Sequence, residues 1–81
     1  MAIYQLRLAL PDRPGSLGMV ASAIGFAGCN IRSLAVVENS DGRALDDFVV
    51  NIPGSDPGDL ITVLSDISGV EILSAFPVEG E

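Results

Sequence analysis

Residues 30–52, NIRSLAVVENSDGRALDDFVVNI, contain two largely apolar segments separated by the turn sequence Asn39-Ser40-Asp41-Gly42. Asp-Gly is the pair typical of a two-residue hairpin turn, because both positions must accept positive φ angles. From Asp47 to Ile52 every second residue is a large apolar one, which is the period of a strand. The sequence therefore predicts an antiparallel hairpin with strands at 30–38 and 44–52.

A strand and a helix flank this hairpin on each side. Before it, residues 3–10 alternate as a strand does, and residues 17–27 place apolar side chains at helical spacing. After it, residues 60–67 repeat the helical spacing, and residues 70–76 form a last apolar strand. This order predicts a ferredoxin-like βαββαβ sandwich of the α+β class. Its four-stranded antiparallel sheet would carry both helices on one face and leave the other face to a partner or solvent.

Capping signals set the expected helix ends. We expect Ser16 to be the N-cap of the first helix and Gly28 to follow its last turn. For the second helix we expect Asp56 to cap the start, with Pro57 at the first helical position. Gly69 is expected to end that helix as Gly28 ends the first.

The length of 81 residues allows one hydrophobic core. We expect a single domain, with its core at about residues 3–76 and a frayed acidic tail at residues 77–81. A domain of this size buries only about 60% of the surface that its unfolded chain exposes, so self-association would add stability. The net charge of −7, without any lysine, argues against a nucleic acid or an anionic membrane as partner. Because neither a signal segment nor a membrane span is visible, we expect a cytoplasmic protein.

Residues that carry chemistry are sparse. The absence of histidine removes the commonest general base and metal ligand. Cys29 is the only cysteine, so an internal disulfide or a Cys-rich metal site is excluded, and we expect it to be a small buried apolar residue. Asp46 and Asp47 are adjacent in a strand and face opposite sides, and we interpret them as a solvated edge. The sequence thus predicts no catalytic residues, no metal site, no cofactor and no enzymatic activity.

The loop Asp12–Leu17 is the candidate binding site. A helix start leaves backbone N–H groups unpaired at the positive end of the helix dipole, which suits a carboxylate. Gly15 has no side chain, so a ligand can approach the backbone closely there. Asn30 follows the same helix and offers both a donor and an acceptor. Because the loop and Asn30 lie at opposite ends of that helix, we expect them to meet across the two-fold axis of a dimer.

The loop, together with Gly28-Cys29-Asn30-Ile31, resembles the ACT domain of amino-acid-responsive regulators and enzymes. The resemblance extends over residues 3–76. It implies that an amino acid binds between two copies of the domain, between the first loop of one and the second strand of the other. It also implies that the domain is joined to, or acts on, an enzyme domain or another partner in the cell.

The resemblance also assigns roles to residues. Gly15, Ser16 and Leu17 would supply main-chain amides, Asn30 its side-chain amide, and Asp12 a carboxylate for the ammonium group of the ligand. The expected ligand-binding residues are Asp12, Arg13, Pro14, Gly15, Ser16, Leu17, Asn30 and Ile31.

Several of these residues have another interpretation. Asp12 can form hydrogen bonds within its own turn, and Asn30 can be structural, since it tolerates left-handed geometry. Arg13 can pair with surplus acids, or cradle a phosphate as in acylphosphatase-type enzymes, although the glycine-rich sequence of those enzymes is missing. We therefore expect a non-catalytic regulatory domain that binds an amino acid or a similar small molecule as a homodimer or higher homo-oligomer. The alternative is a purely structural homodimerisation module without a ligand.

Overall fold

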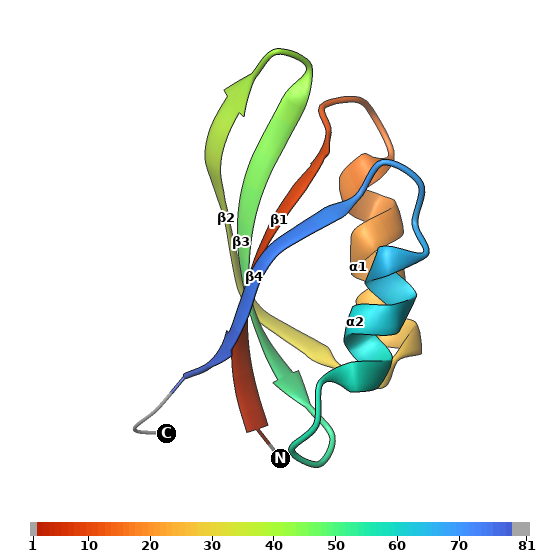
Figure 1. Cartoon of the computed structure of the whole chain (residues 1–81), viewed down its shortest axis with the longest axis vertical. Helices are drawn as coiled ribbons and strands as arrows, with labels where there is room; N and C mark the ends of the chain where they lie inside the picture. The colour runs from red at the N-terminus through yellow and green to blue at the C-terminus, as the bar shows by residue number, and fades with distance from the viewer. Residues whose placement is uncertain (1, 79–81) are drawn as a thin grey trace.

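The computed structural model describes residues 2–78 and has the predicted order βαββαβ (Figure 1). Its strands form one antiparallel sheet in the order β2-β3-β1-β4, and both helices cover one face of that sheet. The chain therefore has the ferredoxin-like α+β fold that the sequence predicts. No helix within residues 2–78 is long and apolar enough to cross a membrane. The elements are β1 (Ala2–Pro11), α1 (Ser16–Phe26), β2 (Asn30–Ser40), β3 (Arg43–Ile52), α2 (Gly58–Ser65) and β4 (Glu71–Pro77).

The β2–β3 hairpin is closed by the predicted turn. Asp41 (φ 55°) and Gly42 (φ 74°) are both left-handed, which is the conformation of a type I′ turn. This turn places Ser40 directly opposite Arg43 and so sets the register of the hairpin. Arg43 then ties the hairpin to its surroundings, because its guanidinium donates to the carbonyl oxygens of Gly69 (3.0 Å) and Ala9 (3.3 Å).

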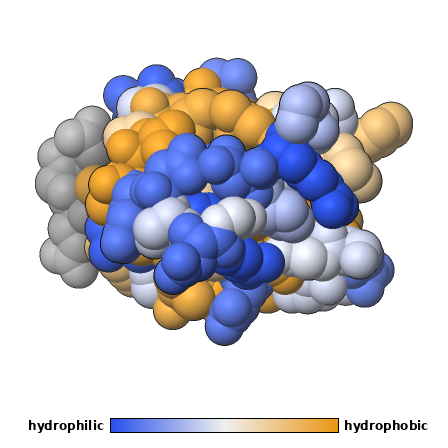
Figure 2. All heavy atoms as spheres, turned by 90° about the horizontal axis from the view of Figure 1, so that it is seen from above, coloured by the Kyte–Doolittle hydropathy of each residue, from blue (hydrophilic) through white to orange (hydrophobic). Residues whose placement is uncertain are grey.

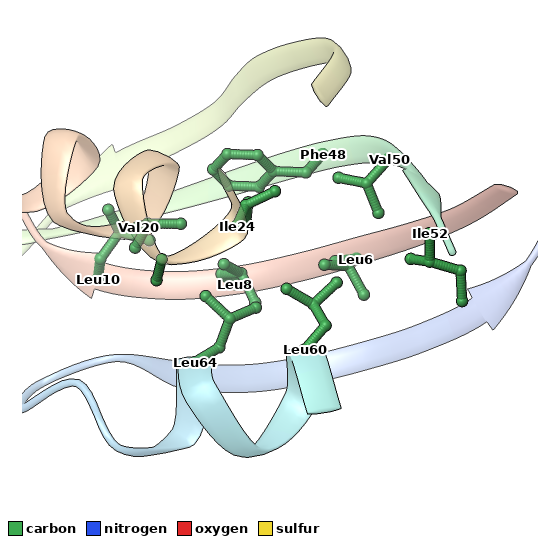
Figure 3. Close-up of a cluster of buried hydrophobic side chains, with 11 residues drawn as sticks. Leu6, Leu8, Leu10, Val20, Ile24, Phe48, Val50, Ile52, Leu60 and Leu64 are labelled. Atoms are coloured by element: carbon green, nitrogen blue, oxygen red, sulfur yellow. The ribbon is translucent and has the colours of Figure 1, made fainter. Parts of the chain in front are cut away.

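The hydrophobic core lies between the sheet and the two helices (Figure 3). Alternate residues of β1 and β3 point into it, as the strand period predicts. Burying one such side chain completely stabilises the fold by about 1.5–3 kcal/mol. The side chains at its centre are Leu6, Leu8, Leu10, Val20, Ile24, Phe48, Val50, Ile52, Leu60 and Leu64.

The start of α1 corrects the prediction that Ser16 is an N-cap. Ser16 is the first helical residue, Gly15 occupies the N-cap with φ 91°, and no side chain caps the helix. The sharp turn before the helix needs a left-handed residue, which only glycine adopts readily, so Ser16 is displaced into the first turn. At the other end Gly28 stops the helix as predicted: its N–H donates to Gly25 O (3.0 Å), and that of Cys29 to Ile24 O (3.1 Å).

Helix α2 is shorter than predicted. It begins at Gly58, so Pro57 is the N-cap and not the first helical residue as predicted. Asp56 lies one residue before the cap, and its Oδ1 accepts a hydrogen bond from the N–H of Gly58 (2.9 Å). The helix ends at Ser65 rather than near Gly69, which corrects the predicted role of that glycine. Asp66 follows directly, and a carboxylate is unfavourable at the negative end of a helix dipole.

The two ends of the chain extend slightly beyond the predicted core. Pro77 belongs to β4, and the N–H of Val78 donates to the carbonyl oxygen of Ile3 (2.9 Å). The predicted tail is therefore part of the fold up to this point. The fraying expected of residues 79–81 falls outside the described residues.

Candidate functional site

A small pocket lies under the loop that the sequence analysis selected. Its volume is about 120 Å³. This is below the roughly 300–1,000 Å³ of sites for drug-sized ligands, so it suits the polar head of a small molecule. We call it the loop pocket; its lining residues are Leu10, Pro11, Asp12, Arg13, Ser16, Leu17, Val36, Asn39, Ala44 and Asp46.

The loop pocket lies at the end of the molecule where the β2–β3 hairpin and the loop after β1 project (Figure 1). Figure 2 views the molecule from this end. Hydrophilic residues cover the centre of the view, and hydrophobic residues lie beside them. A polar ligand that approaches from this side therefore meets polar groups first.

The structure brings together only part of the predicted site. Asp12, Arg13, Ser16 and Leu17 line the loop pocket. Pro14 lines a separate hollow of about 50 Å³ on the other side of the loop, and Gly15 lines neither of these two pockets. Asn30 and Ile31 begin β2, at the far end of α1, and do not line the loop pocket. Within one chain the loop and Asn30 are thus separated, so they can form one site only if two copies of the chain meet.

The start of α1 offers backbone donors to this pocket. The N–H of Ser16 donates to Arg13 O (3.3 Å), and the first regular helical hydrogen bond runs from the N–H of Met19 to Gly15 O (2.9 Å). The N–H groups of Leu17 and Gly18 have no acceptor within residues 2–78. Two unpaired amides at the positive end of a helix are a suitable place for a carboxylate.

Asp46 is the site residue that the sequence analysis missed. Its side chain is 2% exposed, and its Oδ1 has no hydrogen-bond partner among residues 2–78, so the interpretation as a solvated edge is wrong. Asp46 is in phase with Phe48 and Val50, which point to the face covered by the helices. That alternation was visible in the sequence and was the signal for its burial. Val36 and Asn39 of β2 also line the pocket and were not predicted.

The electrostatic environment of Asp46 is unfavourable for a charge. Burial raises the pKa of this carboxyl above its ordinary value, and the negative charges of Asp12 and Asp47 raise it further. Within a poorly solvated site, a carboxylate is costly unless a cation or several donors meet it. The loop pocket therefore combines an unpaired helix-start amide, that of Leu17, which suits an anion, with carboxylates that suit a cation.

Asp47 has the opposite environment, on the other face of the sheet. Its Oδ1 accepts a hydrogen bond from Arg7 Nε (2.7 Å) and its Oδ2 one from Arg7 Nη2 (2.9 Å). Arg7 lies directly opposite Asp47 in the β1–β3 register. This bidentate pair holds the pKa of Asp47 below its ordinary value. The prediction that the two acids face opposite sides is confirmed.

Other chemistry-bearing groups are weaker candidates. Cys29 is half-buried rather than buried, and burial raises the pKa of its thiol, which disfavours the reactive thiolate. Within residues 2–78 no three His, Cys, Asp or Glu side chains lie close enough to hold a metal ion. A hollow of about 510 Å³ between α1 and α2 has no charged residue in its lining, so it suits an apolar occupant.

The edge strand β2 exposes an apolar surface. Leu34, Val36 and Val37 are 40%, 59% and 48% exposed, and β2 pairs with β3 along one edge only. An exposed edge strand with apolar side chains is a template for pairing with another chain. This surface adjoins the loop pocket, since Val36 belongs to both.

No family model matches the chain. Solved structures are similar to it in fold, among them a protein of unknown function from Galdieria sulphuraria: the TM-score is 0.82 at 17% identity, over 99% of this chain and 46% of that one. For an uncharacterised protein from Thermotoga maritima the TM-score is 0.70 at 21% identity, over 96% of this chain and 98% of that one. For a formyltetrahydrofolate deformylase from Pseudomonas putida KT2440 the TM-score is 0.68 at 14% identity, over 91% of this chain and 28% of that one. The chain thus spans less than half of the first and third proteins, and such identities show the fold alone.

Proposed function

We propose that this chain is a regulatory domain of the ACT type that binds an amino acid, or a similar small zwitterion, where two copies meet. The observation that supports the proposal is the loop pocket at the start of α1, whose lining includes Leu17 with its unpaired N–H group; the unpaired N–H of Gly18 is the next along the helix. These donors, with Arg13 beside them, would bind the carboxylate of the ligand. Asp12 lines the same pocket, where it would face the ammonium group.

The second copy would pair through β2. If the two-fold axis passes through the middle of the strand, at Ala35, residues whose numbers add up to 70 face one another. Leu34 of one copy then lies opposite Val36 of the other, and Arg32 opposite Glu38, which joins apolar to apolar and positive to negative. The same register brings Ile31 of the partner subunit opposite the Asn39 that lines the loop pocket, and Asn30 of the partner subunit opposite Ser40, one position further along the strand. The two separated parts of the predicted site would meet in this way.

Ligand binding in such an interface would act through the association of the copies. A molecule that binds the dimer and not the monomer stabilises the dimer by mass action. If the domain is coupled to an enzyme, the same difference in affinity becomes regulation. In support, the similar part of the Pseudomonas putida deformylase is 28% of that chain, so the fold occurs as one part of an enzyme. We place the protein in the cytoplasm, without catalytic activity of its own.

A thermal-shift screen against the twenty amino acids tests the proposal. We expect one or a few of them to raise the melting temperature of the wild type and light scattering to give a dimer. Asn30→Ala should lose most of this response, whereas Ser33→Ala, an exposed change in the same strand, should keep it. A monomer at high concentration, or no response to any amino acid, would overturn the proposal.

The second candidate function is dimerisation without a ligand. The apolar surface of β2 favours it as much as it favours a ligand-binding dimer. It leaves the buried, unpartnered carboxylate of Asp46 without a role, which is why we rank it second. A dimer that responds to no amino acid would be the result that supports this function.

A further inference from the structure

Asp46 is the only charged residue in the buried part of residues 2–78. The residues in phase with it on β3, Ala44 and Phe48, are apolar, so packing alone does not require a carboxylate at this position. A buried carboxylate without a hydrogen-bond partner at Oδ1 destabilises the fold rather than supporting it. The side chain faces the loop pocket, where it lacks a cation.

The basic groups of the chain do not fill this role. Arg7 pairs with Asp47 on the other face of the sheet, and Arg43 donates to main-chain oxygens of Ala9 and Gly69. Arg13 lines the same pocket, but no ion pair or hydrogen bond joins it to Asp46. Arg32, the fourth arginine, lines a different pocket. A cationic partner for Asp46 Oδ1 would therefore come from outside the described residues.

We propose that Asp46 binds the ammonium group of the ligand, so that the loop pocket selects molecules with a free, positively charged amine. An ammonium group has three donors and no acceptor, and the pocket can meet it with the carboxylates of Asp46 and Asp12 and the side-chain oxygen of Asn39. The inference rests on the proposed function for the nature of the ligand. It adds the group that recognises the amine, and it excludes as ligands carboxylic acids that lack an amine and amino acids whose amine is acylated.

A divalent metal ion suits the site less well than an ammonium group. Calcium and magnesium take six or more oxygen ligands, whereas the pocket presents two carboxylates and one amide. The unpaired α1 amide of Leu17, a residue in the lining of the same pocket, is a donor and repels a cation. A zwitterion satisfies both halves of the site, with its ammonium at Asp46 and its carboxylate at the start of α1.

The test compares ligands and variants by calorimetric titration and thermal shift. The probes are the amino acid to which the wild type responds, its N-acetyl derivative, ethylammonium chloride and calcium chloride. We expect the N-acetyl derivative not to bind and Asp46→Asn to bind the amino acid about tenfold more weakly or worse, as loss of a charged hydrogen bond implies. Asp47→Asn, the same change one residue along on the other face, should bind as the wild type does.

The outcomes separate this inference from the proposed function. If Asp46→Asn binds the amino acid as tightly as the wild type, the inference is wrong and the proposed function stands. If the wild type responds to ethylammonium but to no amino acid, and Asp46→Asn to neither, the inference stands and the proposed function is wrong. A response to calcium that Asp46→Asn lacks, or no response to any probe, overturns the inference.

A measurement on the wild type guards against a variant that does not fold. The carboxyl carbon resonance of Asp46 in a ¹³C NMR titration should move when the amino acid is added and stay in place with its N-acetyl derivative. Equal movement with both compounds would mean that Asp46 does not contact the amine, and would overturn the inference.

Discussion

Asp12 and Asp46 face one pocket from different parts of the chain, and the negative charge of Asp12 is one of the forces that raise the pKa of Asp46. Asp12 follows β1 directly, and its N–H donates to Gly42 O at the hairpin turn (2.8 Å), so the loop and the hairpin are held together. The two carboxylates therefore repel each other, and one cation between them would relieve this repulsion. The charge of Asp47, beside it in β3, also raises the pKa of Asp46, and Arg13 is the basic residue in the lining of the pocket.

Asp46→Asn should stabilise the free protein at neutral pH. The pKa of Asp46 is raised in the folded state, so the folded state binds more protons and stability falls as pH rises from the ordinary aspartate range through the raised pKa. Above that range the wild type holds a buried charge that the variant lacks, and we expect a gain of roughly 1–3 kcal/mol. Urea unfolding of both proteins from pH 3 to pH 8 measures it. A loss of stability that is the same at every pH would contradict the expectation.

Asp47→Asn should have the opposite effect. The pKa of Asp47 is lowered by Arg7, so its contribution to stability is present above the ordinary aspartate pKa and is lost as pH falls through the lowered value. We expect the variant to be less stable than the wild type at pH 7 and equally stable in strong acid. The same unfolding series measures both variants, and added salt should shrink the difference, because Arg7 is partly exposed.

The order of elements and the hairpin turn were predictable because local signals carry them: the strand period, the helical spacing and Asp41-Gly42. The start of α1 was not predicted correctly. Serine is a residue type that often caps helices, which favoured Ser16, but the turn before the helix needs the positive φ angle that Gly15 adopts. The burial of Asp46 was not predicted, because two adjacent acids usually lie in solvent. Its alternation with Phe48 along the strand was the signal that its side chain points to the core face. The combination of loop, β2 and β3 in one pocket depends on tertiary structure, and no local pattern contains it.

Gly69→Ala should destabilise the fold, and Gly25→Ala should stabilise it. Gly69 has φ 84°, and a Cβ there would lie 2.9 Å from Pro11 Cγ, so the backbone and the contact both disfavour a side chain. We expect a loss of about 1–3 kcal/mol. Gly25 is helical and open, and alanine there should add about 0.5–1 kcal/mol. Thermal unfolding of the two variants measures both changes in stability. If Gly69→Ala were as stable as the wild type, the turn before β4 would be able to relax around the added side chain.

Ala35→Cys should cross-link two copies of the chain through their β2 strands. In the proposed register Ala35 faces itself across the two-fold axis, and directly opposed Cα atoms of antiparallel strands lie about 4.5–5.5 Å apart, which is within disulfide range. Cys29→Ser serves as the background, so that only the introduced thiol reacts. Mild oxidation followed by a non-reducing gel should show a covalent dimer.

Ser33→Cys in the same background is the control for the register. It would face Val37 of the partner subunit, so the two introduced thiols would be four residues apart along the strands, about 13 Å at 3.3 Å per residue, and should not join. Cross-linking of Ser33→Cys but not of Ala35→Cys would move the axis toward the start of β2. That register would place Asn30 of the partner subunit opposite Val36 instead of Ser40, and Ile31 of the partner subunit would no longer lie opposite Asn39, so the proposed arrangement of the site would be wrong.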